Sequence, residues 1–206
     1  MQFMQELKQQ RWDDHRYYHH NRINQSLHLF SATCFLATYL FLFVNPIVAA
    51  FCGWVLAMVS RQIGHFFFEP KGFDEANQVT HEHKEEIKVG YNLNRKVVLL
   101  TLWALTPAFL VWQPTAFGLF EAHQNNYELL YNLSWLWIYL GIAAVLFRTV
   151  QLFFQQSVLT GIAWFTKILT DPFHDIKLYH KAPIEVLRGN LYDPIVTPDG
   201  TEAEAR

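Results

Sequence analysis

The sequence has few cysteines, little net charge and long stretches without any charged residue. It contains two cysteines and balances 16 Lys and Arg against 18 Asp and Glu, for a formal net charge of -2. Two cysteines buried in apolar runs do not suggest a disulfide framework or a cysteine-rich zinc knuckle. The near-neutral balance also excludes the broad basic surface that nucleic-acid binding requires, so no nucleic-acid partner is expected.

The charge-free stretches indicate a membrane protein. Lys, Arg, Asp and Glu are absent from residues 23–60, 97–120 and 129–147. A helix needs about 20 mostly apolar residues to cross the hydrocarbon core of a bilayer. The expected fold class is therefore all-α, a polytopic membrane helical bundle of about four transmembrane helices with additional interfacial helices. The four predicted spans cover residues 27–44, 47–60 with an extension to 68, 97–120 and 129–147.

The remaining segments are polar or mixed. Residues 149–166 have no charge but carry three glutamines among apolar residues, which favours a helix in the membrane plane over a fifth span. We expect a single membrane-embedded domain over residues 1–170 and a polar cytoplasmic tail over 171–206. The charged opening, Met1 to Arg22, lacks the pattern of a cleavable signal peptide.

The positions of lysine and arginine predict the orientation. These residues precede the first span, lie between the second and third, and follow the fourth, whereas residues 45–46 and 121–128 contain none. By the positive-inside rule, both termini and the long connector face the cytoplasm. We therefore expect a multi-pass protein of a bacterial inner membrane or the endoplasmic reticulum. Nine of the ten histidines then lie on the cytoplasmic side, and only His123 lies opposite.

Several of these histidines have the spacing of helix faces. Residues three or four apart share a face of a helix, so His15 and His19 would form one stripe. His20, Asn24 and His28 would form a neighbouring stripe. Imidazoles that converge from several helices suit iron, manganese or zinc. We expect a metal centre at the cytoplasmic mouth of the bundle.

Further candidates follow the second span. His65 and Glu69 are one helical turn apart at its end, and His81 and His83 form a His-x-His pair in the connector. Ionisable groups at membrane depth are costly unless they are paired or functional. The alternative for His81 and His83 is a solvated helix, and a single histidine near an interface is more often a hydrogen-bonding residue than a ligand. His174 and His180 have a structural role in the simpler interpretation.

Two short segments carry a resemblance to a known family. They are YHHNRINQSLH at residues 18–28 and GHFFFE at residues 64–69. The shared features are a histidine nine residues before a second, an asparagine four before that second histidine, and Gly-His-x-x-x-Glu at the end of a later helix. In this order the segments resemble the membrane-embedded 2-hydroxy fatty acid dioxygenases of fungal endoplasmic reticulum and many bacteria, over roughly residues 15–70.

The resemblance implies an Fe(II) cofactor held by histidines. The implied reaction is fatty acid α-oxidation, in which O2 shortens a long-chain 2-hydroxy fatty acid by one carbon at the bilayer. The resemblance also implies that His19, His28 and His65 are iron ligands, and that Asn24 and Glu69 orient ligands or bind the substrate head. Together with the other histidine patterns, the candidate metal ligands are His19, His20, His28, His65, His81 and His83. Candidates to neutralise the substrate carboxylate are Arg22, Lys71 and Lys84.

Two other functions stay open. His15-x-x-x-His19-His20 is similar to one histidine box of membrane di-iron fatty acid hydroxylases and desaturases, which usually have about eight histidines in three boxes. The other alternative is a non-catalytic, metal-binding membrane scaffold. The number of irons per chain separates the two enzyme classes, and O2 consumption with a 2-hydroxy acid separates the dioxygenase from the scaffold.

Overall fold

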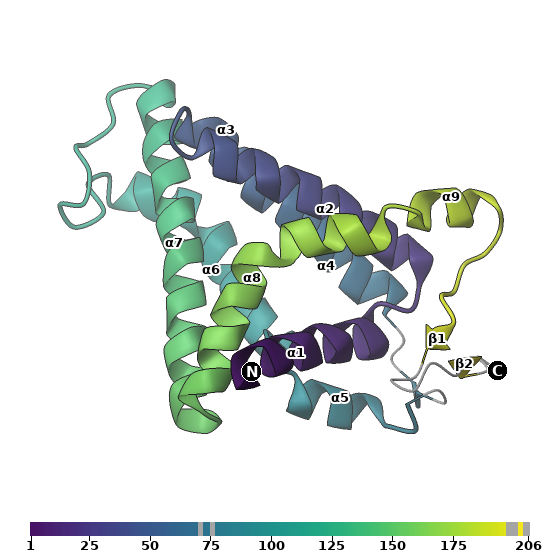
Figure 1. Ribbon diagram of the computed structural model, residues 1–206. Coiled ribbons are helices and arrows are strands. Elements are labelled where there is room, and N and C mark those ends of the chain that lie inside the picture. The colour runs from purple at the N-terminus through teal and green to yellow at the C-terminus, as the bar shows by residue number, and fades with distance from the viewer. Residues whose placement is uncertain (70–71, 75–76, 197–201, 204–206) are drawn as a thin grey trace.

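The computed structural model describes residues 1–69, 72–74, 77–196 and 202–203, and about three quarters of them are helical (Figure 1). The elements in chain order are α1 (Gln2–Tyr18), α2 (Arg22–Phe41), α3 (Pro46–Ala50), the π-helix η1 (Phe51–Met58), α4 (Val59–Ile63), the π-helix η2 (Gly64–Phe68), α5 (His81–Ile87), α6 (Leu93–Trp112), α7 (Asn126–Gln155), α8 (Val158–Tyr179) and α9 (Ala182–Leu187). A short antiparallel pair, β1 (Ile195–Val196) and β2 (Glu202–Ala203), follows α9. The all-helical expectation is confirmed apart from this pair.

Three helical segments in the described part of the chain are long and apolar enough to cross a membrane. They are Pro46–Phe68, which joins α3 to η2, Leu93–Trp112 and Asn126–Gln155. Fewer than a fifth of the residues in the most apolar windows of α6 and α7 are buried, and apolar side chains such as Leu102 and Ile142 are exposed. Apolar surface on this scale marks a membrane or protein contact. Together these features indicate a membrane protein.

The first predicted span corresponds to α2, which is not among these three segments. Its first two turns contain Arg22, Asn24, Gln25 and His28, and these polar side chains lower its mean hydropathy. The turn predicted after it is confirmed. The Asn45 side chain accepts hydrogen bonds from two backbone N–H groups of α3, and Pro46 begins that helix in the position where a missing N–H costs nothing.

The later helices differ from the prediction in length. α6 ends at Trp112 rather than near residue 120, and α7 runs on to Gln155. The expectation of one in-plane helix over residues 149–166 was wrong. The helix breaks at Gln156, and the Ser157 side chain caps the next helix by accepting a hydrogen bond from the Thr160 N–H at 3.0 Å.

α8 returns from the end of α7 to lie beside α1 and α2 (Figure 1). Two side chains of α1 hydrogen-bond to it: Gln10 donates to the Thr160 carbonyl at 3.1 Å, and Arg11 donates to the Thr170 hydroxyl at 2.8 Å. The predicted boundary between residues 170 and 171 therefore falls inside α8. Its C-terminal half packs against the other helices instead of forming part of a polar tail, because Asp171, Asp175 and Tyr179 are buried there.

Candidate metal centre

The first two histidines of the centre lie on either side of a tight turn. α1 ends at Tyr18, and the side chain of Asn21 begins α2 by accepting hydrogen bonds from the N–H groups of the second and third residues after it. On a continuous helix, nine residues would separate His19 from His28 by about 13 Å. The turn reverses the chain and leaves their Nε2 atoms 3.2 Å apart. The expected single helical stripe through residues 20, 24 and 28 was wrong, because the helix is broken at 19–21.

Two amide side chains of α2 hold this turn in place. Asn24 Nδ2 donates to the Tyr18 carbonyl at 2.8 Å, and Gln25 Nε2 donates to the His19 carbonyl at 2.8 Å. The Gln25 amide also donates to Asp193 Oδ2 at 3.0 Å. The last carbonyls of a helix have no partner inside it, so these amides supply one. Asn24 therefore contacts the turn that carries His19, and it is not a member of the histidine group.

The third histidine comes from the π-helix η2. Such wide helical turns occur frequently at functional sites. The residue before it, Gly64, lies directly against α2, and a Cβ at this position would collide with the side-chain oxygen of Asn24. Glycine therefore allows the close approach that brings His65 to His28. One turn later, Glu69 Oε2 lies 2.6 Å from His65 Nδ1.

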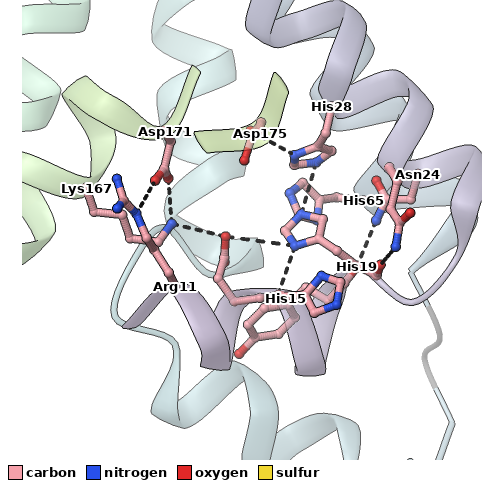
Figure 2. A network of polar contacts seen from close by, with 12 residues as sticks. Arg11, His15, His19, Asn24, His28, His65, Lys167, Asp171 and Asp175 are labelled. Atoms are coloured by element: carbon pink, nitrogen blue, oxygen red, sulfur yellow. Dashed lines mark hydrogen bonds and ion pairs between the residues drawn. The ribbon is translucent and has the colours of Figure 1, made fainter. Parts of the chain in front are cut away.

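His19, His28 and His65 form a compact group (Figure 2). One ring nitrogen from each lies within 4.8 Å of the others, and this is the only set of three or more potential ligands found in the described residues. The ring centroids are 4.1 to 5.3 Å apart. His19 and His28 are each 2% exposed. The spacing and burial suit a single metal ion.

Each ring of the group faces an acceptor with its Nδ1 atom. His19 Nδ1 donates to the Asp14 carbonyl at 2.9 Å, and His65 Nδ1 donates to Glu69 at 2.6 Å. His28 Nδ1 lies 3.9 Å from Asp175 Oδ2. A metal-bound histidine usually donates its other ring N–H to such a partner, which fixes its tautomer and orientation. With each Nδ1 turned to an acceptor, Nε2 is the ring atom that remains to bind an ion, and the Nε2 atoms of His19 and His28 lie 3.2 Å apart.

A network of ion pairs surrounds the group (Figure 2). Arg61 donates to Asp175 at 2.6 Å. Lys167 donates to Asp171 at 2.6 Å and to Asp14 at 3.1 Å. Paired in this way, buried charges are tolerated and hold their neighbours in one arrangement. The network fixes α8 against α1 and α4 around the histidines.

Burial and charge also determine the protonation of the centre. Burial lowers the pKa of His19 well below its usual value of 6.5, so the ring is neutral at physiological pH. Burial raises the pKa of the Asp14 carboxyl, but attraction to Lys167 and His19 outweighs this effect and holds the pKa below its usual range. Neutral imidazole is the form that binds metal ions. The centre is therefore ready to accept a cation without first releasing a proton from His19.

The histidine group opens onto a large cavity. Its volume is about 840 Å³, within the range of ligand-binding pockets. His28 and His65 line it together with apolar side chains from three helices, among them Leu42, Trp54 and Ile138. Residues 28 and 42 lie about 21 Å apart along α2. The cavity therefore connects a polar, histidine-lined end to a long apolar interior.

Comparisons with protein-family models, curated proteins and solved structures found no match to this chain. The ligand atoms that the site offers limit the chemistry that it can support. Neither cysteine is in the group, and both have free thiols, so a thiolate zinc site is excluded among the described residues. The group provides three imidazole ligands, fewer than the about eight histidines that di-iron hydroxylases and desaturases usually have.

The other candidate ligands lie outside the group. His20 is buried at the turn, where its carbonyl accepts a hydrogen bond from the Asp193 N–H. His83 is exposed on α5, and His81 lines a small cavity of about 50 Å³ beside His65. The prediction that these three histidines join the metal centre is not supported. His174 and His180 are not in the group either.

The candidates to bind a carboxylate are engaged elsewhere. Arg22 pairs with Glu185 at 3.2 Å and with Asp193 at 3.3 Å. Lys84 is fully buried and lies 3.4 Å from Asp74. Lys71 lies outside the described residues. Neither Arg22 nor Lys84 lines the large cavity.

Sequence reasoning missed the supporting residues from α8. Lys167, Asp171 and Asp175 are spaced four residues apart, which places them on one face of a helix. The rest of this segment is rich in apolar residues. Three charged residues on one face of such a helix therefore indicate that this face packs against a polar site. Asp14 left no such signal, because its contact with His19 uses the backbone carbonyl.

Proposed function

We propose that this protein is a membrane-embedded, Fe(II)-dependent dioxygenase that shortens long-chain 2-hydroxy fatty acids by one carbon. One observation carries the proposal: two histidines of a three-imidazole group line an elongated apolar cavity. The group suits an iron with open coordination positions, and the cavity suits a long alkyl chain. The resemblance of residues 18–28 and 64–69 to the dioxygenase family supports the same conclusion.

The overall reaction needs only the two proposed substrates. An acid R–CH(OH)–COOH and O2 give R–COOH, CO2 and water, so atoms and electrons balance without a separate reductant. Bound Fe(II) would supply Lewis acidity and redox chemistry toward O2. His19, His28 and His65 would hold it.

The residues of the chain itself orient and enclose the reactants. Asp14, Asp175 and Glu69 hold the three rings in fixed orientations through Nδ1. The apolar cavity wall excludes water from the alkyl chain and fixes its direction. Holding a substrate in one orientation removes much of the entropic cost of reaction.

The test uses purified, detergent-solubilised protein loaded with Fe(II). We expect O2 uptake with 2-hydroxypalmitate and release of pentadecanoate, and no uptake with palmitate, which lacks the hydroxyl group. His28→Ala should abolish the uptake while the protein remains in the membrane fraction. Iron bound at one per chain without O2 uptake, at any chain length of 2-hydroxy acid, would overturn the enzymatic proposal in favour of a metal-binding scaffold.

We also propose that α2 is a fourth membrane crossing and that both termini face the cytoplasm. Support comes from the charge-free residues 23–60 and from the distribution of lysine and arginine. The test places single cysteines in a chain without Cys34 and Cys52. A membrane-impermeant maleimide added to intact cells should label His123→Cys and leave Lys8→Cys unlabelled. Labelling of both positions, or of Lys8→Cys alone, would contradict this topology.

A further inference from the structure

Five cationic side chains line the large cavity, and four of them have a carboxylate partner among the described residues. These four are Arg16 with Asp13, Arg61 with Asp175, Lys88 with Glu69 and Glu85, and Lys167 with Asp14 and Asp171. The fifth, Lys96, has no ion pair and no side-chain hydrogen bond within the described chain. A half-buried ammonium group without a partner costs free energy. The simplest reason for its position is that a bound anionic ligand supplies the partner.

Lys96 is close to the histidine group. It lies in the first turn of α6 and lines the large cavity together with His28 and His65. It also lines the small cavity of about 50 Å³ that His65 and Glu69 share. A cavity of this size holds only a few atoms. Lys96 therefore borders both cavities that His65 lines.

Lys88, another cation that lines the large cavity, is already paired within the protein. Its Nζ lies 3.3 Å from Glu85 and 3.6 Å from Glu69, and 3.6 Å from the centre of the Tyr18 ring. These contacts use its charge within the protein. An anionic ligand in the cavity would therefore find its free cationic partner at Lys96.

We propose that Lys96 binds the carboxylate of the acyl ligand, with the alkyl chain extending along α2 toward Leu42. This inference rests on the proposed function, because it takes the ligand to be a long-chain acid. A charge-assisted hydrogen bond from an ammonium group to a carboxylate is about twice as strong as a neutral one. It would place C1 and C2 of the acid at the histidine end of the cavity. Lys96 then selects acids over neutral lipids of equal length.

The experiment measures binding and needs no turnover. Trp54 and Trp164 line the cavity, so their fluorescence reports ligand entry in metal-free, detergent-purified protein. Two ligands are compared, 2-hydroxypalmitate and hexadecane-1,2-diol, which has the same chain length and no carboxylate. The variants are Lys96→Met, Lys96→Gln and Lys96→Arg. Lys177→Met is the matched control, because Lys177 is an exposed cation of α8 outside the cavity.

We expect Lys96→Met and Lys96→Gln to raise the Kd of the acid by about tenfold or more, with the Kd of the diol within about twofold of wild type. Lys96→Arg should retain most of the affinity, and Lys177→Met should change neither ligand. Two results would overturn the role of Lys96 and leave the proposed function standing. One is an equal loss of affinity for the acid and for the diol, and the other is an affinity for the acid that neither neutral variant changes. A wild-type protein that binds neither ligand would overturn the proposed function as well.

Discussion

Two groups of histidines in this protein are candidate metal ligands in the sequence but differ in the fold. His81 and His83 are two residues apart on α5, and such residues do not share a helix face. His83 is exposed, and the buried Nδ1 of His81 has no hydrogen-bond partner among the described residues. The group of His19, His28 and His65 instead draws on three separate elements, and each Nδ1 atom faces an acceptor. Whether histidines can form a metal site therefore depends on which segments of the chain the fold brings together and on the acceptors that orient each ring.

The largest expected effect comes from removing one ring of the group. His28→Ala should lower bound iron from one per chain to nearly none, because two imidazoles cannot hold the ion at micromolar concentration. His83→Ala should leave the iron content unchanged. Metal analysis of both variants after Fe(II) loading and desalting makes the measurement. Equal iron loss in the two variants would remove the distinction between the groups.

A second test changes the contact between η2 and α2. Gly64→Ala forces a Cβ into the Asn24 side chain and should destabilise the protein by about 1–3 kcal/mol, as overpacked sites do. Gly72→Ala is the matched control, because a Cβ there meets no atom of the described residues within 4 Å. Thermal unfolding in detergent compares the two. An unchanged midpoint for Gly64→Ala would show that η2 can move away from α2 at little cost.

A third test concerns the support that α8 gives to His28. Asp175→Asn removes a negative charge that faces both His28 and Arg61. Loss of such a partner typically lowers metal affinity by about 10- to 100-fold. The control is Asp13→Asn, which breaks a partly exposed pair with Arg16 instead. Competition with a chelator of known affinity measures both, and equal affinities would exclude a role for Asp175 in the centre.

The smallest effect is a pH dependence of stability. Burial lowers the pKa of His15 below 6.5 in the folded protein, so the unfolded chain binds a proton more readily. The contribution of His15 to the free energy of unfolding is complete above pH 6.5. It decreases as the pH falls below this value, by at most about 1.4 kcal/mol per pH unit. His15→Gln should flatten the decline between pH 7 and 5, whereas substitution of the exposed His180 should not. The measurement is the thermal unfolding midpoint of metal-free wild type and both variants between pH 7 and 5. An equal decline in wild type and His15→Gln would contradict the prediction.

The sequence predicts the membrane helices well, because absence of charge is a property of composition that no tertiary contact needs to supply. α6 and α7 overlap the predicted spans 97–120 and 129–147, although their ends differ from the prediction. The boundaries near Gln156 and Ser157 were not predicted, since a single serine cap separates two apolar helices there. Hydropathy gave no sign of this break.

For the candidate site, the segment resemblance named the three histidines that the structure brings together. It could not show how they meet, because the reversal at Asn21 depends on a cap and on amides that contact backbone carbonyls. It also could not show the contribution of α8, whose Asp175 lies 147 residues after His28 in the chain. Contacts between distant segments leave no periodic pattern in either one.

The hydrogen bonds that hold the turn between α1 and α2 have a consequence for biogenesis. The His20 carbonyl accepts a hydrogen bond from the Asp193 N–H, and the Arg22 N–H donates to the Leu191 carbonyl. Leu191 is translated 126 residues after His65, the last of the three histidines. A nascent protein thus contains all three histidines well before these supports exist, and we expect iron to be retained only once residues 191–193 have been made.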